Sequence, residues 1–316
     1  MPKKSQIAES FQSEILQLEA QRKSIASQIL LYYGLGIICL VGMFIGFEYG
    51  LPLLITGFLL ILFVGYKLYH LGQAQKHFKE HYKLDILKRA LESYSPELVF
   101  KPGYGIGEAE FNNSNLFSQS PDRYYSEDYM QAKVGKTAFY FAEVHAEYKT
   151  VTHTKHGRQE HWHDIFKGIL FVADFNKYFN GTTIVRPKDF SFNLSKWTGF
   201  SMFQKSSDAM VKLENPEFSK AFVCYSNDQV EARYILTPKL MEEIVELNAR
   251  CNETISLSFS DHKVHIAFPL RNNYFDAGLY KNLTKSKTLE TDLEVIDFVF
   301  QIIEDLDLNT RIWTKN

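Results

Sequence analysis

Imidazole and carboxylate side chains gather in one short stretch of this sequence. Its members are His153, His156, Glu160, His161, His163 and Asp164, around an expected hairpin tip near His156 and Gly157. His161 and His163 point to the same face of a strand, and folding the hairpin back brings His153 within reach. Because these side chains are ligands of zinc and other divalent metals, the pattern predicts a metal site at His153, His161 and His163. A solvated hairpin tip without an ion is the alternative, and no other cofactor is expected.

Glu143, His145 and Glu147 form a second candidate site, because alternate residues of a strand share one face. Two carboxylates on either side of an imidazole could act as a general acid and base. The same alternation is typical of an ordinary polar strand face, and we favour that interpretation.

Trp162 is the aromatic residue best suited to bind a partner protein. It lies between two histidines at the expected hairpin tip, whereas core filling accounts for most of the 26 Phe and 18 Tyr residues. Trp is enriched among the residues that dominate binding energy at protein interfaces. The sequence therefore predicts Trp162 as a partner anchor.

The signatures of common catalytic classes are missing. The sequence has no G-x-S-x-G elbow, kinase motif set, H-E-x-x-H helix or Cys-His nucleophile pattern. KPGYGIG at residues 101–107 matches no phosphate-binding loop, and its glycines and proline favour a flexible joint. Cys39, Cys224 and Cys251 lack the paired spacing of a disulfide framework or zinc site, which fits a reducing compartment. Whether the chain is an enzyme therefore stays open.

Two uncharged apolar runs near the N-terminus have the pattern of membrane-spanning helices. If they span a membrane, the rest of the chain is anchored there. Residues 29–47 and 51–66 are separated only by Glu48, Tyr49 and Gly50. Each run approaches the roughly 20 residues that cross the hydrocarbon core as a helix. A long polar segment precedes the first run, which argues against a signal peptide. A buried core hairpin would carry a polar stripe. We therefore expect a two-span hairpin over residues 29–69.

Positive charges predict the orientation of this hairpin. Arg22 and Lys23 precede the first run, basic residues recur from Lys67 to Arg89, and the turn between the runs has none. Since Lys and Arg near the ends of a span are retained in the cytoplasm, both termini should be cytoplasmic.

Amphipathic segments flank the two runs. Residues 1–28 carry an apolar seam of alternating three and four spacing that is interrupted by Arg22, and residues 70–100 carry a comparable stripe. The two segments could pair as an antiparallel helical stalk, because the hairpin holds them close together. Self-association as a coiled coil, giving a homo-oligomer, is the competing interpretation.

Residues 101–316 have the pattern of one soluble domain. Residues 140–149 alternate apolar and polar side chains, hairpins are expected at Asn180-Gly181 and at residues 260–263, and helices are expected at 237–247 and 289–306. The fold class is therefore α+β with a mostly antiparallel sheet. A net charge of −2 gives no electrostatic footprint for nucleic acid.

Several short segments carry a family resemblance, and they are Leu116-Phe117, Glu127-Asp128-Tyr129 with Gly135, Phe166-Lys167-Gly168, Asp174-Phe175-Asn176-Lys177, Asn215-Pro216, Ser226-Asn227-Asp228-Gln229, residues 231–238, and Leu308-Asn309-Thr310-Arg311-Ile312-Trp313. Together they resemble a bacterial family of two-span membrane proteins of the domain-of-unknown-function 3137 type. The resemblance implies the membrane arrangement, but it does not indicate any particular activity. Ser126 stands where a glycine is expected in this family. Asp228 and Glu231 also have the spacing of a capping box.

The sequence thus predicts a bacterial inner-membrane protein whose cytoplasmic domain is a binding or scaffold module for a protein partner or ligand. The alternative is a membrane-tethered enzyme, with or without a bound metal, that uses the His-rich hairpin.

Overall fold

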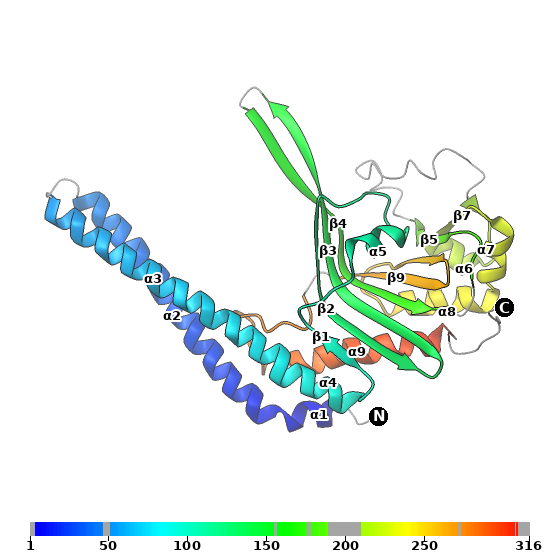
Figure 1. The fold of residues 1–316 in the computed structure, drawn as a ribbon, viewed down its shortest axis with the longest axis horizontal. Coiled ribbons are helices and arrows are strands. Elements are labelled where there is room, and N and C mark those ends of the chain that lie inside the picture. Colours follow the sequence, from blue (N-terminus) through cyan, green and yellow to red (C-terminus); the bar gives the residue numbers. More distant parts are fainter. Residues whose placement is uncertain are drawn as a thin grey trace. The chain divides into compact units, whose positions relative to one another are not determined.

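The computed structural model describes residues 4–46, 51–154, 157–175, 178–188, 210–270, 273–306 and 308. The chain divides into two compact units, of which unit 1 comprises Met1–Ser95 with Tyr274–Glu294 and unit 2 comprises Pro96–Asn273 with Val295–Asn316. Unit 1 is helical and unit 2 is built on a sheet (Figure 1). The fold class is α+β, with two long apolar helices followed by a large antiparallel sheet and its helices.

Unit 1 is dominated by a helical hairpin. Its elements are α1 (Lys4–Ser10), α2 (Gln12–Gly46), α3 (Leu51–His81), the π-helical segment η1 (Tyr82–Leu87) and α4 (Lys88–Tyr94). Two helices in the described residues are long and apolar enough to cross a membrane. Only 11% of the apolar window of each is buried, so the buried-core alternative does not fit. The turn at residues 47–50 lies outside the described residues.

The polar extensions of this hairpin pack within one chain. Helix α2 contacts α3 and η1, and α1 contacts α4. Leu18 of α2 and Ile86 and Leu87 of η1 are fully buried. These contacts bury apolar side chains from both segments, which stabilises their packing.

A segment that sequence periodicity did not assign also belongs to unit 1. Residues 274–287 bring Phe275, Leu279 and Leu283 into buried positions. Arg22 donates to the Leu279 carbonyl oxygen at 2.6 Å and makes two 2.8 Å hydrogen bonds to the Glu19 carboxylate. Hydrogen bonding from Arg22 holds the pKa of Glu19 below its usual value. The arginine that interrupts the apolar seam is therefore a buried, paired residue.

Unit 2 contains one sheet, with nine strands among the residues that the structure describes. The strands run antiparallel in the order β1-β2-β3-β4-β9-β8-β5-β7-β6. Their bounds are β1 Val99–Lys101, β2 Arg123–Val134, β3 Thr137–Thr154, β4 Gly157–Asp174, β5 Thr183–Pro187, β6 Met210–Val211, β7 Phe222–Ser226, β8 Ser256–Ser260 and β9 Lys263–Pro269. The accompanying helices are α5 Glu108–Asn113, α6 Pro216–Ala221, α7 Gln229–Ile235, α8 Pro238–Ala249 and α9 Thr288–Asp305, of which α9 belongs to unit 2 from Val295 onward and to unit 1 before it.

Helices cover both faces of this sheet. On one face, Phe111 of α5 packs with Ala142 and Val144 of β3 in a buried cluster. On the opposite face, Phe300 of α9 makes an edge-to-face contact with Phe139 at 5.3 Å between ring centroids. We call this second side the α9 face, because α9 packs on it. The candidate site described below lies on the same face.

Several local predictions are confirmed. Thr237 caps α8, its side chain accepting a hydrogen bond from the Leu240 N–H, and α9 spans nearly the expected residues. Strands β8 and β9 form the hairpin expected at residues 260–263, with Asp261 in a left-handed conformation at φ 54°.

The hairpin expected at Asn180-Gly181 is wrong. Strand β5 begins at Thr183 and pairs with β7 and β8 rather than with the residues before it. The backbone N–H groups of Asn180 and Gly181 instead donate to the Glu231 carboxylate at 3.1 and 2.9 Å. Asp228 is the N-cap of α7, as expected, but Glu231 binds this loop and does not complete the capping box.

Residues 101–107 are hydrogen-bonded along β2, so the flexible joint expected there is also wrong. The N–H of Asp128 donates to the Pro102 carbonyl oxygen and that of Tyr129 to the Tyr104 carbonyl oxygen. Ser126, at the position of the expected glycine, accepts from the Ile106 N–H and donates to the Glu143 carbonyl oxygen, both at 2.9 Å. Its hydroxyl therefore joins this segment to β2 and β3.

Candidate functional site

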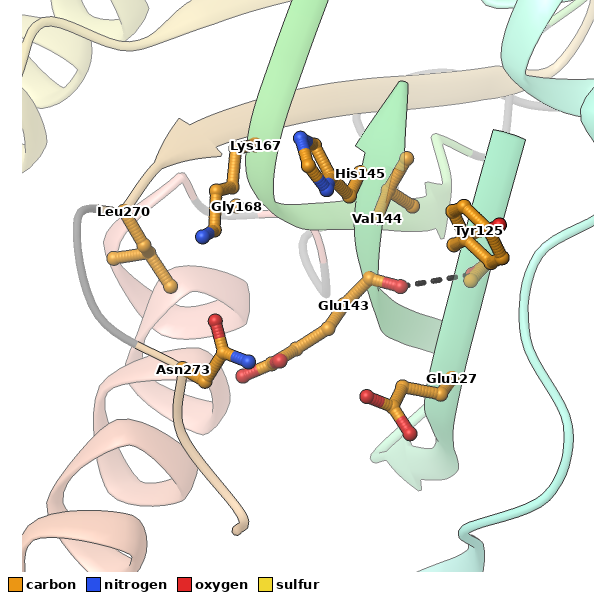
Figure 2. A pocket seen from close by; sticks show the side chains of 10 residues that line it. Tyr125, Glu127, Glu143, Val144, His145, Lys167, Gly168, Leu270 and Asn273 are labelled. Atoms are coloured by element: carbon orange, nitrogen blue, oxygen red, sulfur yellow. Dashed lines mark hydrogen bonds between the residues drawn. The ribbon is translucent and has the colours of Figure 1, made fainter. Parts of the chain in front are cut away.

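A pocket lies on the α9 face where β2, β3 and β4 meet the segment after β9 (Figure 2). Its volume is about 320 Å³. The lining residues are Tyr125, Ser126, Glu127, Glu143, Val144, His145, Lys167, Gly168, Leu270 and Asn273. Figure 2 shows the Glu143 side chain extending toward Asn273, with Glu127 on its β2 side. Carboxylate, imidazole, ammonium and amide groups thus converge on one hollow, as in ligand sites.

A bulge in β2 positions the acidic side of the pocket. The register with β3 shifts by one residue between Glu127 and Met130, and Asp128 within the bulge has φ 57°. The bulge brings carboxylate oxygens of Glu127, Asp128 and Glu143 within 4.8 Å of one another. Bulges re-aim side chains in this way next to binding sites.

A second bulge, between β3 and β4, adds His145, Glu147 and Asp164. Ala146 lies opposite Phe166 but Glu147 lies opposite Asp164, so Ile165 is the extra residue. Without the bulge, Ile165 would face Glu147, and Asp164 would point to the other side of the sheet. The bulge places Asp164 on the α9 face, where its Oδ1 lies 2.7 Å from His145 Nε2.

The three candidate acid/base residues share one face but contact different groups. Glu143 lines the pocket, His145 contacts Asp164, and Glu147 forms an ion pair with Arg123 at 3.2 Å. Lys167 lies opposite His145 across the strands. We did not single out Lys167 as a site residue from the sequence, since its place in the pocket depends on the pairing of β3 with β4.

Gly168 allows the backbones of β4 and β9 to approach each other closely beside the pocket. A Cβ atom at this position would lie 2.0 Å from the Phe268 carbonyl oxygen. A side chain is therefore incompatible with the observed approach of β4 and β9.

Beyond the pocket, β3 and β4 continue as a two-stranded ribbon that projects from the sheet (Figure 1). We call residues 148–154 and 157–163 the ribbon. Pairing of β2 with β3 ends at Arg123 opposite Glu147, and β9 pairs with β4 only as far as Gly168. The ribbon strands consequently pair only with each other among the described residues.

The ribbon does not bring the three predicted metal ligands together. His153 lies opposite Arg158, whereas His161 lies opposite Thr150 and His163 opposite Tyr148. Because facing residues of antiparallel strands share a side, His153 is on the α9 face and the other two are on the reverse. His163 Nε2 lies 2.9 Å from the Thr150 hydroxyl, and its ring stacks on Tyr148. His156 lies outside the described residues.

Trp162 lies on the α9 face of the ribbon and is 36% exposed. The Arg123 guanidinium lies 3.9 Å from the centre of its ring, and the Lys149 ammonium lies at 5.5 Å. Cation–π contacts of this kind fix an aromatic side chain in place. The pocket and Trp162 therefore occupy one continuous face.

Comparison with known proteins adds a family match. None of the curated proteins matches the chain. The crystal structure of the mycobacterial trehalose monomycolate transport factor A, TtfA, is 8% identical, with a TM-score of 0.33 over 69% of this chain and 94% of that chain. A likeness of this size says nothing about what the chain binds. The model of a family described as "Protein of unknown function (DUF3137)" matches residues 164–308, which supports the resemblance over that part of the chain.

Proposed function

We propose that this chain is a membrane-anchored binding module that holds an acidic protein partner against the α9 face of the ribbon. The proposal includes the orientation expected from the basic residues, with both termini and the sheet on the cytoplasmic side of a bacterial inner membrane. The exposed ribbon is the observation that carries it.

The ribbon has no hydrophobic core of its own. Every residue from Gly157 to Asp164 is exposed, on both sides of the strand pair. An isolated two-stranded ribbon is at best marginally stable in water. A partner that covers one side would stabilise it and would bury Trp162 and Val151, the large exposed apolar side chains of the α9 face.

Charge favours an acidic partner. The α9 face of the ribbon and its base carry Arg123, Lys149 and Arg158 around Trp162. Glu160 lies among these cations, 2.8 Å from Arg158 and 3.5 Å from Lys149. At the base, Glu147 balances the Arg123 charge, whereas on the ribbon itself Lys149 and Arg158 outnumber Glu160 by one. This net positive charge of the ribbon complements carboxylates arranged around an apolar pocket for the indole.

We expect Trp162→Ala to reduce partner capture in membranes by 10-fold or more, the loss typical of an interface hot spot. A photo-crosslinking amino acid at Val151, on the same face, would report capture in otherwise wild-type and Trp162→Ala chains. Tyr178→Ala, which removes an exposed aromatic residue outside the ribbon, is the matched control. Equal crosslinking yields in the wild-type, Trp162→Ala and Tyr178→Ala backgrounds would contradict the proposal.

The pocket favours a second candidate function, a membrane-tethered enzyme or small-ligand receptor. Glu143, His145 and Lys167 line one hollow and could exchange protons with a polar substrate. We expect native mass spectrometry of the gently extracted protein to detect a bound small molecule that Lys167→Met releases and Lys133→Met retains. Identical spectra of wild type and Lys167→Met would exclude ligand binding through this ammonium group.

A further inference from the structure

His145, Glu147 and Asp164 have the donor types of a transition-metal site. One atom from each side chain, an imidazole nitrogen and two carboxylate oxygens, lies within 4.8 Å of the other two. From this geometry we propose that the three residues bind one divalent ion of the zinc type at the base of the ribbon. The inference is independent of the proposed partner, because no donor comes from outside the chain.

The backbone holds these donors in place before any ion binds. All three residues lie on paired strands, and the β3–β4 bulge puts Asp164 on the side of His145 and Glu147. A site on rigid strands loses little conformational entropy when it binds a ligand. A regular ladder would have left only His145 and Glu147 on this face.

The charges around the cluster favour a cation. Two carboxylates contribute two negative charges, and Glu143 lies on the same face two residues before His145. Arg123 pairs with Glu147 at 3.2 Å and Lys167 lies opposite His145. A bound ion would compete with Arg123 for Glu147, so binding should release the guanidinium toward Trp162, which it already contacts.

Binding also requires a change of protonation at His145. Its Nε2 now lies 2.7 Å from Asp164 Oδ1, a distance at which a proton sits between the two atoms. A metal needs the Nε2 lone pair, so the proton must leave or the neutral ring must carry it on Nδ1.

The pocket leaves room for further coordination. His145 borders the pocket and the Asp164 side chain is largely exposed, so water could reach an ion bound between them. Three protein ligands and an open position are typical of catalytic zinc sites. The imidazole donor favours Zn²⁺ over Mg²⁺, which prefers oxygen ligands.

Isothermal titration of the full chain in detergent with Zn²⁺ tests this assignment. We expect one equivalent to bind, His145→Ala and Asp164→Asn each to weaken binding at least 10-fold, and Mg²⁺ to bind far more weakly. The matched control is the double variant His161→Ala/His163→Ala, which removes two imidazoles from the reverse side of the ribbon and should bind as wild type does.

Each other outcome overturns the assignment. Wild type without stoichiometric Zn²⁺ binding would remove the site, and loss of binding in the double variant would transfer it to the ribbon histidines. Tighter Mg²⁺ than Zn²⁺ binding would indicate the all-carboxylate group of Glu127, Asp128 and Glu143 instead. Because Asp164 is largely exposed, the Asp164→Asn variant should fold normally. It therefore keeps the test valid even if the His145→Ala variant does not fold.

Discussion

Raising the pH from about 4 to about 8 is expected to destabilise unit 1 by about 4 kcal/mol through Asp292. This carboxyl is buried, accepts hydrogen bonds from the Tyr82 hydroxyl at 2.6 Å and the Phe275 N–H at 3.0 Å, and faces the Asp276 and Lys281 charges. Burial raises the pKa of Asp292 from 3.8 to about 7. Desolvation of the charged form therefore outweighs the two hydrogen bonds that favour it.

The sign follows from which state holds the proton more tightly. The folded chain keeps Asp292 protonated at pH values where the unfolded chain has released the proton, so protonation stabilises the fold. The contribution is fully present below about pH 4 and is lost as the pH rises through about 7.

Asp292→Asn removes the charge, keeps one acceptor oxygen for the Phe275 N–H, and places its NH2 group beside the Tyr82 hydroxyl, which can accept a hydrogen bond. The variant should therefore lose most of this dependence. Urea unfolding followed by circular dichroism from pH 4.5 to 8 would measure it, as the difference in midpoint between wild type and variant. Glu294→Gln, an exposed change two residues away, is the control and should keep the wild-type slope. Parallel midpoint curves for wild type and Asp292→Asn would show that Asp292 does not titrate in this range.

Gly168→Ala should destabilise unit 2 by about 3 kcal/mol or more, the range of severe backbone clashes. The new methyl group would lie 2.0 Å from the Phe268 carbonyl oxygen, and neither atom belongs to a flexible side chain. Relief requires β4 and β9 to separate at this end of their ladder, which breaks backbone hydrogen bonds there and opens the pocket wall.

Urea midpoints of the purified chains would measure the Gly168→Ala effect. Gly103→Ala is the matched control, because nothing lies within 4 Å of a Cβ at that position. Equal midpoints for the two alanine variants would mean that the strands move apart at little cost and that Gly168 does not determine the pocket.

Local signals predicted the elements of this fold well. The alternation along residues 140–149 belongs to β3, and Thr237-Pro238 starts α8, since strand period and helix capping depend on neighbouring residues. The apolar runs predicted α2 and α3 for the same reason. The position of a strand within the sheet depends on distant partners, and β5 beside β8 and β7 could not be predicted locally.

The candidate site was harder to predict because two bulges create it. Counting by twos from the hairpin tip puts His161 and His163 on one side correctly, but the register also puts His153 on the other side. The bulge at Ile165 moves Asp164 to the opposite side of the strand, and no residue type in the sequence indicates that a bulge occurs there. The hairpin predicted at Asn180-Gly181 was wrong for a different reason. The carboxylate of Glu231, which is distant in sequence, accepts hydrogen bonds from the N–H groups of both residues.

The buried contact of Arg22 with Leu279 also sets an order for synthesis. These residues are 257 positions apart, so the apolar helices and unit 2 up to Asn273 are synthesised before the acceptor carbonyl exists. The Glu19–Arg22 pair can therefore gain this buried contact only after residue 279 has been synthesised. Packing of residues 274–287 against α2 thus becomes a late step of folding, and a chain that stops before residue 279 lacks the acceptor for Arg22.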